Sequence, residues 1–193
     1  MKLNRINWFG LAGGLTVVVL VFASVAFAYP WWQLEVGEGF FEAHTSPMNT
    51  NFSLLGNMLT IPLIYFLNLT CLLSLIASAV AMLFYSVLPT KSYSKDLLGF
   101  AYKKPLVTLL VFVIGLLIVT YAAGLLFQIS FPMVGSTTVR LPASMSGGTE
   151  INVPIVTSFT WIFWLAVVAA ALCIAARLYH KRIAPTQPPT QPN

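Results

Sequence analysis

The residues best suited to chemistry are four ionisable side chains in one short polar segment, Glu35, Glu38, Glu42 and His44. Carboxylates and imidazoles bind divalent cations, so one interpretation is a metal site. The other is a solvated rim, because the alternating pattern from Trp32 to Val36 predicts a strand whose apolar face excludes Glu35. We favour the solvated rim, and we expect neither a metal nor another cofactor.

A second polar candidate, Asn68, lies near the centre of a long apolar segment, and Gln128 lies near the end of another. Enzymes and transporters in membranes usually carry ionisable residues at depth. The four apolar stretches, 8–29, 58–88, 106–129 and 156–176, contain no Asp, Glu, Lys, Arg or His. We therefore interpret Asn68 as an interhelical hydrogen-bonding residue and expect no enzymatic activity. A small transporter, channel or lipid-handling enzyme is the alternative, and it would require Asn68, Gln128 or the glutamates to matter.

The composition defines the elements that hold these residues. The chain has 193 residues, of which 58% are hydrophobic and 8% charged, whereas soluble domains carry about 25% charged residues. A membrane-spanning helix needs about 20 apolar residues. The sequence predicts a mainly α membrane protein, a four-transmembrane-helix bundle with a small extracytoplasmic β-sheet from both outer loops. The predicted layout is 1–7 N-terminus, 8–29 first span, 30–57 first outer loop, 58–88 second span, 89–105 cytoplasmic loop, 106–130 third span, 131–156 second outer loop, 157–178 fourth span and 179–193 Pro-rich tail.

The positive charges predict the orientation of the four spans. Nine Lys and Arg residues and Asp96 lie in the segments 1–7, 89–105 and 177–193, while Arg140 and four glutamates lie in the other two loops. The formal charge of +5 thus divides into +8 and −3, and the positive side is expected to be cytoplasmic, with both termini. An alternative for the first span is a signal peptide cleaved after Ala28, but its apolar run is longer than usual for such a signal.

Three groups of residues should fix the helices in the bilayer. Small residues at helical spacing favour close packing, aromatic residues favour the interface, and basic residues favour the inner leaflet. The packing residues are Gly10, Gly14, Ser74, Ser78 and Cys173; the interface anchors are Trp8, Trp31, Trp32, Trp161 and Trp164; the basic residues are Lys103, Lys104, Arg177, Lys181 and Arg182. Ligand stacking on Trp31 and Trp32 is an alternative to anchoring.

The two outer loops carry strand patterns. In the first, we expect strands in 32–37 and 40–45, followed by an irregular segment from Ser46 to Asn51 that leads into the second helix. In the second, 137–141 and 151–155 alternate around a Pro-, Ser- and Gly-rich turn, and Pro154 predicts an edge strand. We expect a sheet of about four strands.

These features resemble the claudin and peripheral-myelin type of tetraspan protein, which has four spans, cytoplasmic ends and a first outer loop opening with tryptophan. Trp31 and Trp32 match the start of that signature, but the two cysteines that follow it in claudins are absent. The resemblance is one of architecture, and architecture alone implies no function.

The sequence favours a membrane protein that acts through contacts, either laterally between helices or through the outer loops. We expect lipid and other membrane proteins or further copies of the chain as partners, and no nucleic acid. The main alternative is an accessory subunit of a larger membrane complex, such as a respiratory or secretion assembly.

Overall fold

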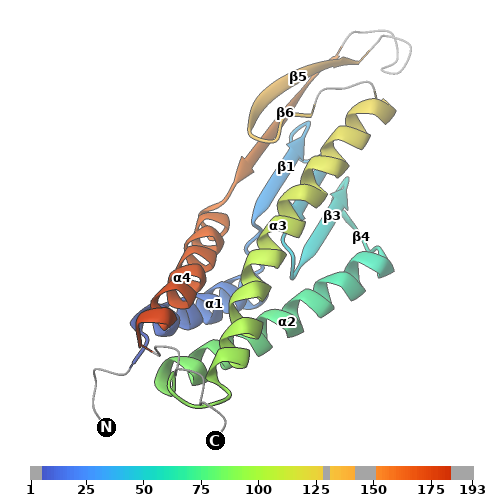
Figure 1. Ribbon diagram of the computed structural model, residues 1–193. Helices are drawn as coiled ribbons and strands as arrows, with labels where there is room; N and C mark the ends of the chain where they lie inside the picture. The colour runs from blue at the N-terminus through green and yellow to red at the C-terminus, as the bar shows by residue number, and fades with distance from the viewer. Residues whose placement is uncertain (1–5, 128–130, 142–150, 184–193) are drawn as a thin grey trace, which may run out of the picture. The chain divides into compact units, whose positions relative to one another are not determined.

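The computed structural model describes residues 6–127, 131–141 and 151–183. Gln128, the expected turn of the second hairpin (142–148) and the end of the Pro-rich tail lie outside these residues. The described part contains four helices and six strands (Figure 1): α1 (Trp8–Ala26), β1 (Trp32–Val36), β2 (Phe41–Thr45), β3 (Thr50–Leu54), β4 (Asn57–Leu59), α2 (Pro62–Val87), α3 (Ser94–Phe127), β5 (Gly135–Leu141), β6 (Ile151–Phe159) and α4 (Trp161–Ile183). All four helices are long and apolar enough to cross a membrane, which indicates a multi-pass membrane protein.

The chain forms two compact units. The helical unit comprises Met1–Val21, Leu73–Leu109 and Leu165–Asn193, and the sheet unit comprises Phe22–Leu72 and Leu110–Trp164. Each helix contributes residues to both units.

Both polar loops join in one antiparallel sheet with the strand order β4-β3-β2-β1-β6-β5. The prediction of about four strands was therefore wrong, because the segment after Ser46 continues the sheet. Ser46 reverses the chain: its backbone N–H donates to the carbonyl of Asn49 at 2.8 Å, and its Oγ accepts from the N–H of Asn49 at 2.9 Å. The returning chain pairs as β3, with Phe52 opposite Ala43.

Pro154 lies on β6, which is an interior strand rather than the expected edge strand. The paired part of β1 ends at Val36, opposite Ile155, so Pro154 is one residue beyond the ladder. The carbonyl of Pro154 accepts from the N–H of Gly37 at 2.8 Å. In an antiparallel pair the N–H and C=O of one residue point to the same neighbour, so the N–H that Pro154 lacks would face the turn after β1. The β5–β6 ladder therefore loses no hydrogen bond.

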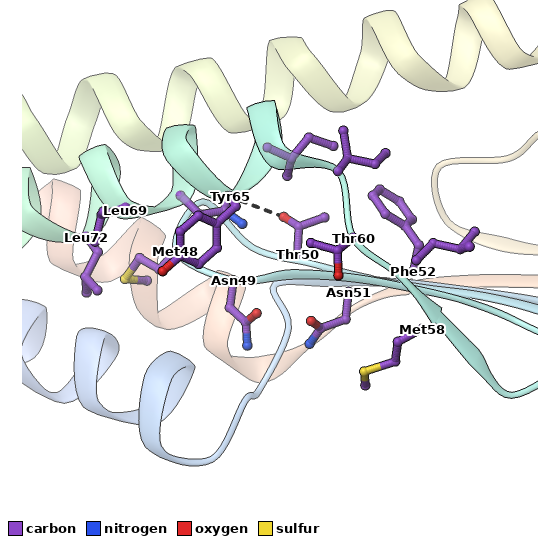
Figure 2. A pocket seen from close by; sticks show the side chains of 14 residues that line it. Met48, Asn49, Thr50, Asn51, Phe52, Met58, Thr60, Tyr65, Leu69 and Leu72 are labelled. Atoms are coloured by element: carbon purple, nitrogen blue, oxygen red, sulfur yellow. Dashed lines mark hydrogen bonds between the residues drawn. The ribbon is translucent and has the colours of Figure 1, made fainter.

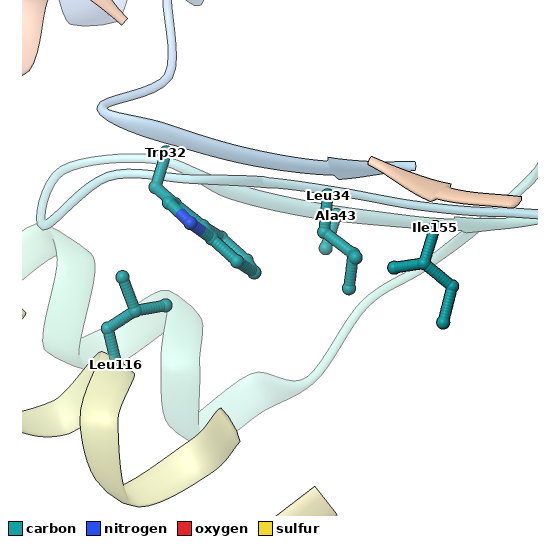
Figure 3. Packing of buried hydrophobic residues seen from close by; sticks show 5 residues of the cluster. All are labelled: Trp32, Leu34, Ala43, Leu116 and Ile155. Carbon is teal, nitrogen blue, oxygen red and sulfur yellow. The ribbon is translucent and has the colours of Figure 1, made fainter. Parts of the chain in front are cut away.

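One face of the sheet carries the core of the sheet unit. Trp32, Leu34, Ala43 and Ile155 point from the strands toward Leu116 of α3 (Figure 3), and all five side chains are buried. This alternation of buried and exposed residues is the reason that these segments form strands with one apolar face. The other face carries polar residues, including Gln33, whose amide donates to Ser158 Oγ at 2.9 Å.

The helices begin at different residues from those predicted. The second and fourth begin at Pro62 and Trp161 rather than at 58 and 157, because strands β4 and β6 occupy the intervening residues. The third helix begins at Ser94 and continues through most of the expected cytoplasmic loop 89–105.

Pro105 lies inside α3 and does not end it. A helical proline leaves the carbonyl four residues earlier, here that of Ala101, without its usual donor. Ser78 Oγ of α2 donates to that carbonyl at 2.7 Å, in a buried position. The hydroxyl of one helix thus replaces the missing hydrogen bond of another.

Candidate functional site

The candidate metal ligands lie in and around the β1–β2 hairpin. Glu35 faces Glu42 across the two strands, and His44 faces Gln33 in the next row. Glu38 occupies the connecting turn with a φ of 49°. Among the described residues, no group of three or more His, Cys, Asp or Glu side chains is placed to hold a metal ion.

Asn68 bonds to the chain reversal before β3 and not to a neighbouring helix. In the amide orientation that satisfies both neighbours, Nδ2 donates to the carbonyl of Pro47 at 3.2 Å and Oδ1 accepts from the N–H of Thr50 at 2.9 Å. The sequence predicted an interhelical hydrogen bond for Asn68; these partners are backbone groups that β3 and the preceding reversal bring alongside α2. Asn68 therefore fastens the sheet to the first turns of α2.

A cleft of about 440 Å³ opens beside this contact, between β3 and β4 on one side and α2 on the other. Figure 2 shows Thr50 and Phe52 on the side of β3 that faces α2, and Asn49 and Asn51 on the opposite side. Its fourteen lining residues include no Asp, Glu, Lys, Arg or His. The cleft is an uncharged space with mostly apolar walls.

At the end of the sheet where the β1–β2 and β3–β4 turns adjoin, Phe40, Leu54 and Leu55 form an exposed apolar tip. Phe40 closes the β1–β2 turn, and Leu54 and Leu55 begin the β3–β4 turn. The N–H of Leu55 donates to the carbonyl of Phe40 at 2.9 Å, which joins the two turns. Their side chains are 53%, 38% and 66% exposed, respectively. Apolar groups gathered on an exposed surface commonly mark an interaction site.

Leu55 also has an unfavourable backbone conformation. Leu55 and Gly56 have φ values of 50° and 77° and form the two-residue loop between Leu54 and Asn57. Positive φ at both positions is typical of a type I′ turn, where Asn, Asp or Gly is favoured. A left-handed conformation costs a non-glycine residue about 1–2 kcal/mol. The turn thus retains an exposed leucine at an energetic cost.

The small residues of the helical unit lie close to neighbouring helices. A Cβ on Gly10 would lie 2.5 Å from Ser86 Oγ, and one on Gly14 would lie 2.9 Å from Leu83 Cδ2. A Cβ on Gly13, on the same helix, would lie 3.2 Å from the Sγ of Cys173. Ser78 makes the hydrogen bond described above, and Ser74, also on α2 in the helical unit, is half-buried.

Asn7 was missed by the sequence analysis, although an Asn just before an apolar helix is a typical N-cap. Its Oδ1 accepts from the N–H of Gly10 at 3.0 Å. Its Nδ2 donates to Tyr85 Oη at 2.7 Å and to the carbonyl of Ala176 at 2.9 Å. Asn7 is fully buried, so one side chain caps α1 and bonds to α2 and α4.

The predicted interface tryptophans divide into two groups. Trp8, Trp161 and Trp164 are 54–60% exposed. Trp31 and Trp32 are buried within the protein: Trp31 Nε1 donates to Ser24 Oγ at 3.3 Å, and Trp32 Nε1 donates to the carbonyl of Met133 at 2.8 Å. Trp31 packs against Phe112 of α3 and Phe163 of α4, and Trp32 lies in the core beneath the sheet. Both are therefore buried residues of the sheet unit rather than lipid-facing anchors.

The predicted basic residues lie on helices of the helical unit. The Arg177 guanidinium lies 4.3 Å from the ring centre of Tyr102, and Lys104 Nζ lies 5.3 Å from that of Phe100. Lys103, Lys181 and Arg182 are exposed.

The chain fits a tetraspan-like architecture, with four membrane-length helices and a small sheet. No protein-family model matches the sequence, and no curated protein matches it significantly. The resemblance to claudins therefore extends to architecture alone.

Proposed function

We propose that this chain is a non-enzymatic, multi-pass membrane protein that acts by contacting a protein partner through the apolar tip of its sheet. In this proposal both termini are cytoplasmic and the sheet lies outside, as the charge distribution favours. The helices anchor the sheet in the membrane.

The observation that carries the proposal is Leu55, which is 66% exposed in a left-handed conformation. Water disfavours the side chain and the turn disfavours the backbone, so folding alone gives no reason for a leucine here. Backbone strain of this kind is commonly retained at functional sites. Phe40 and Leu54 extend the same surface.

The test compares partners that co-purify with the full-length chain after crosslinking in its native membrane and extraction in mild detergent. The double variant Phe40→Ser/Leu55→Asn should lose the partner. The matched control, Gln33→Ser, changes an exposed residue on the polar face of the same sheet and should retain it. Equal recovery with all three proteins, or a strictly monomeric protein on blue-native electrophoresis, would contradict the proposal.

A second candidate, an accessory subunit that makes lateral helix contacts, is supported by the exposure of α3. Only 11% of the most apolar 18-residue stretch of α3 is buried within the chain, against 39% for α1 and for α4. A partner helix would cover this surface as readily as lipid does. In a chain with Cys71 and Cys173 changed to Ala, a cysteine at Ile114, which is 53% exposed, should crosslink to a neighbour. A cysteine at the buried Leu116 should not.

A further inference from the structure

The cleft between β3, β4 and α2 has the chemistry of a site for a hydrocarbon chain. Met48, Phe52, Leu59, Ile64 and Leu72 contribute apolar walls from three different elements and the chain reversal. Its volume of about 440 Å³ lies within the range of about 300–1,000 Å³ that is usual for small-molecule sites. The cleft is therefore large enough for part of an elongated ligand.

Two polar residues that line the cleft, Asn68 and Thr50, form hydrogen bonds with the chain reversal before β3. Asn68 uses both ends of its amide on Pro47 and Thr50, and the Thr50 hydroxyl donates to the carbonyl of Ser46 at 3.0 Å. A polar ligand would have to compete with these hydrogen bonds, and no charged residue lines the cleft to attract an ion. The lining is uncharged and mostly apolar, so it favours an uncharged, apolar occupant.

The position of the cleft on α2 indicates that the apolar ligand comes from the lipid bilayer. Asn68 lies six residues after the start of α2, about 9 Å along the helix. Of the residues that line the cleft, Tyr65 on α2 is 60% exposed and Ile61, just before that helix, is 46% exposed. The helix is of membrane-spanning length. Tyr65 has a ring and hydroxyl suited to the headgroup level. Bilayer lipid therefore surrounds the exposed residues that line the cleft.

From this geometry we propose that the cleft binds the hydrocarbon chain of one bilayer lipid. The chain lies between β3 and α2, from Phe52 and Ile64 toward Leu72, and the polar headgroup remains near Thr60 and Tyr65. The bound lipid fills the space between sheet and helix that Asn68 fastens at one end. This site is separate from the apolar tip, so it does not depend on the proposed protein partner.

The test uses the full-length protein in phosphatidylcholine vesicles that contain a phospholipid with a diazirine in one acyl chain. After illumination, labelled residues are mapped by mass spectrometry. We expect label on both walls of the cleft, at Phe52 or Leu59 and at Ile64. Ile64→Trp, which fills the cleft, should remove most of the label from the strand residues. Leu67→Trp is the matched control, because Leu67 lies on α2, is 57% exposed and does not line the cleft.

Label confined to exposed positions of α2, with none on the strands of the wild-type protein, would overturn the proposal. Undiminished strand labelling in a folded Ile64→Trp protein would also overturn it. If Ile64→Trp fails to fold, Leu72→Trp replaces it, because Leu72 lines the same cleft farther along α2. Leu72→Trp should also remove most of the strand labelling seen in the wild-type protein, and undiminished labelling would overturn the proposal.

Discussion

The helical unit and the sheet unit differ in how they accommodate energetically unfavourable groups. In the helical unit, glycines permit close helix contacts, and Asn7, Ser78 and Tyr85 form buried hydrogen bonds. In the sheet unit, Phe40 and Leu55 expose large apolar side chains, and Leu55 has a positive φ.

The difference distinguishes residues that stabilise the fold, in the helical unit, from Leu55, which we propose is retained for contact with a partner. Packed small residues and paired polar groups lower the free energy of the folded state. A strained, exposed leucine raises it. Substitutions of the packed residues of the helical unit and of Leu55 in the sheet unit should therefore change stability in opposite directions, which tests the comparison directly.

The largest effect is expected for Gly10→Leu in the helical unit. A side chain at this position must displace Ser86, whose Oγ would lie 2.5 Å from the new Cβ. Overpacking of this kind typically lowers the free energy of unfolding by about 1–3 kcal/mol. Thermal unfolding in mild detergent measures the loss. Gly115→Leu is the control, because a Cβ there meets no atom within 4 Å; equal thermal midpoints for the two variants would contradict the packing account.

A second prediction concerns the hydrogen bond between Ser78 and the carbonyl of Ala101. Ser78→Ala leaves that buried carbonyl without a donor, which should lower the free energy of unfolding by about 1–3 kcal/mol. The same change should cost less in a Pro105→Ala protein, because residue 105 then supplies its own N–H to Ala101. A double-mutant cycle measures the difference. An identical cost in both backgrounds would show that Ser78 does not compensate for the proline.

The smallest effect, with the opposite sign, is expected for Leu55→Asn. Asparagine is favoured in a type I′ turn, so the free energy of unfolding should rise by about 1 kcal/mol. The comparison variant is Leu54→Asn, which adds the same amide next to Leu55 at a residue without a positive φ. It should bring no such gain. A lower thermal midpoint for Leu55→Asn would mean that Leu55 serves stability after all.

The sequence predicted the local features of the fold well. Long apolar runs identified four helices, and alternating residues located β1, β2, β5 and β6. These signals are local because the length of a run and its period follow directly from membrane thickness and strand geometry.

The features that the sequence did not predict depend on partners distant along the chain. Strands β3 and β4 were missed because Ser46 and Pro47 suggest irregular structure, and the Leu55–Gly56 turn departs from the usual turn residues. The extension of α3 through Pro105 depends on a hydroxyl from α2. For the candidate site, the sequence identified Asn68 but not the backbone groups that β3 brings to it. The burial of Trp31 and Trp32 likewise depends on packing that no local pattern encodes.

The most direct test of the central claim is photocrosslinking in the native membrane with a photoreactive amino acid at position 55 and, separately, at Gln33. We predict a discrete crosslinked protein from position 55 that is absent from Gln33, on the polar face of the same sheet. The product should also disappear when Phe40→Ser is added. No product from position 55, or the same products from both positions, would contradict a contact role for the apolar tip.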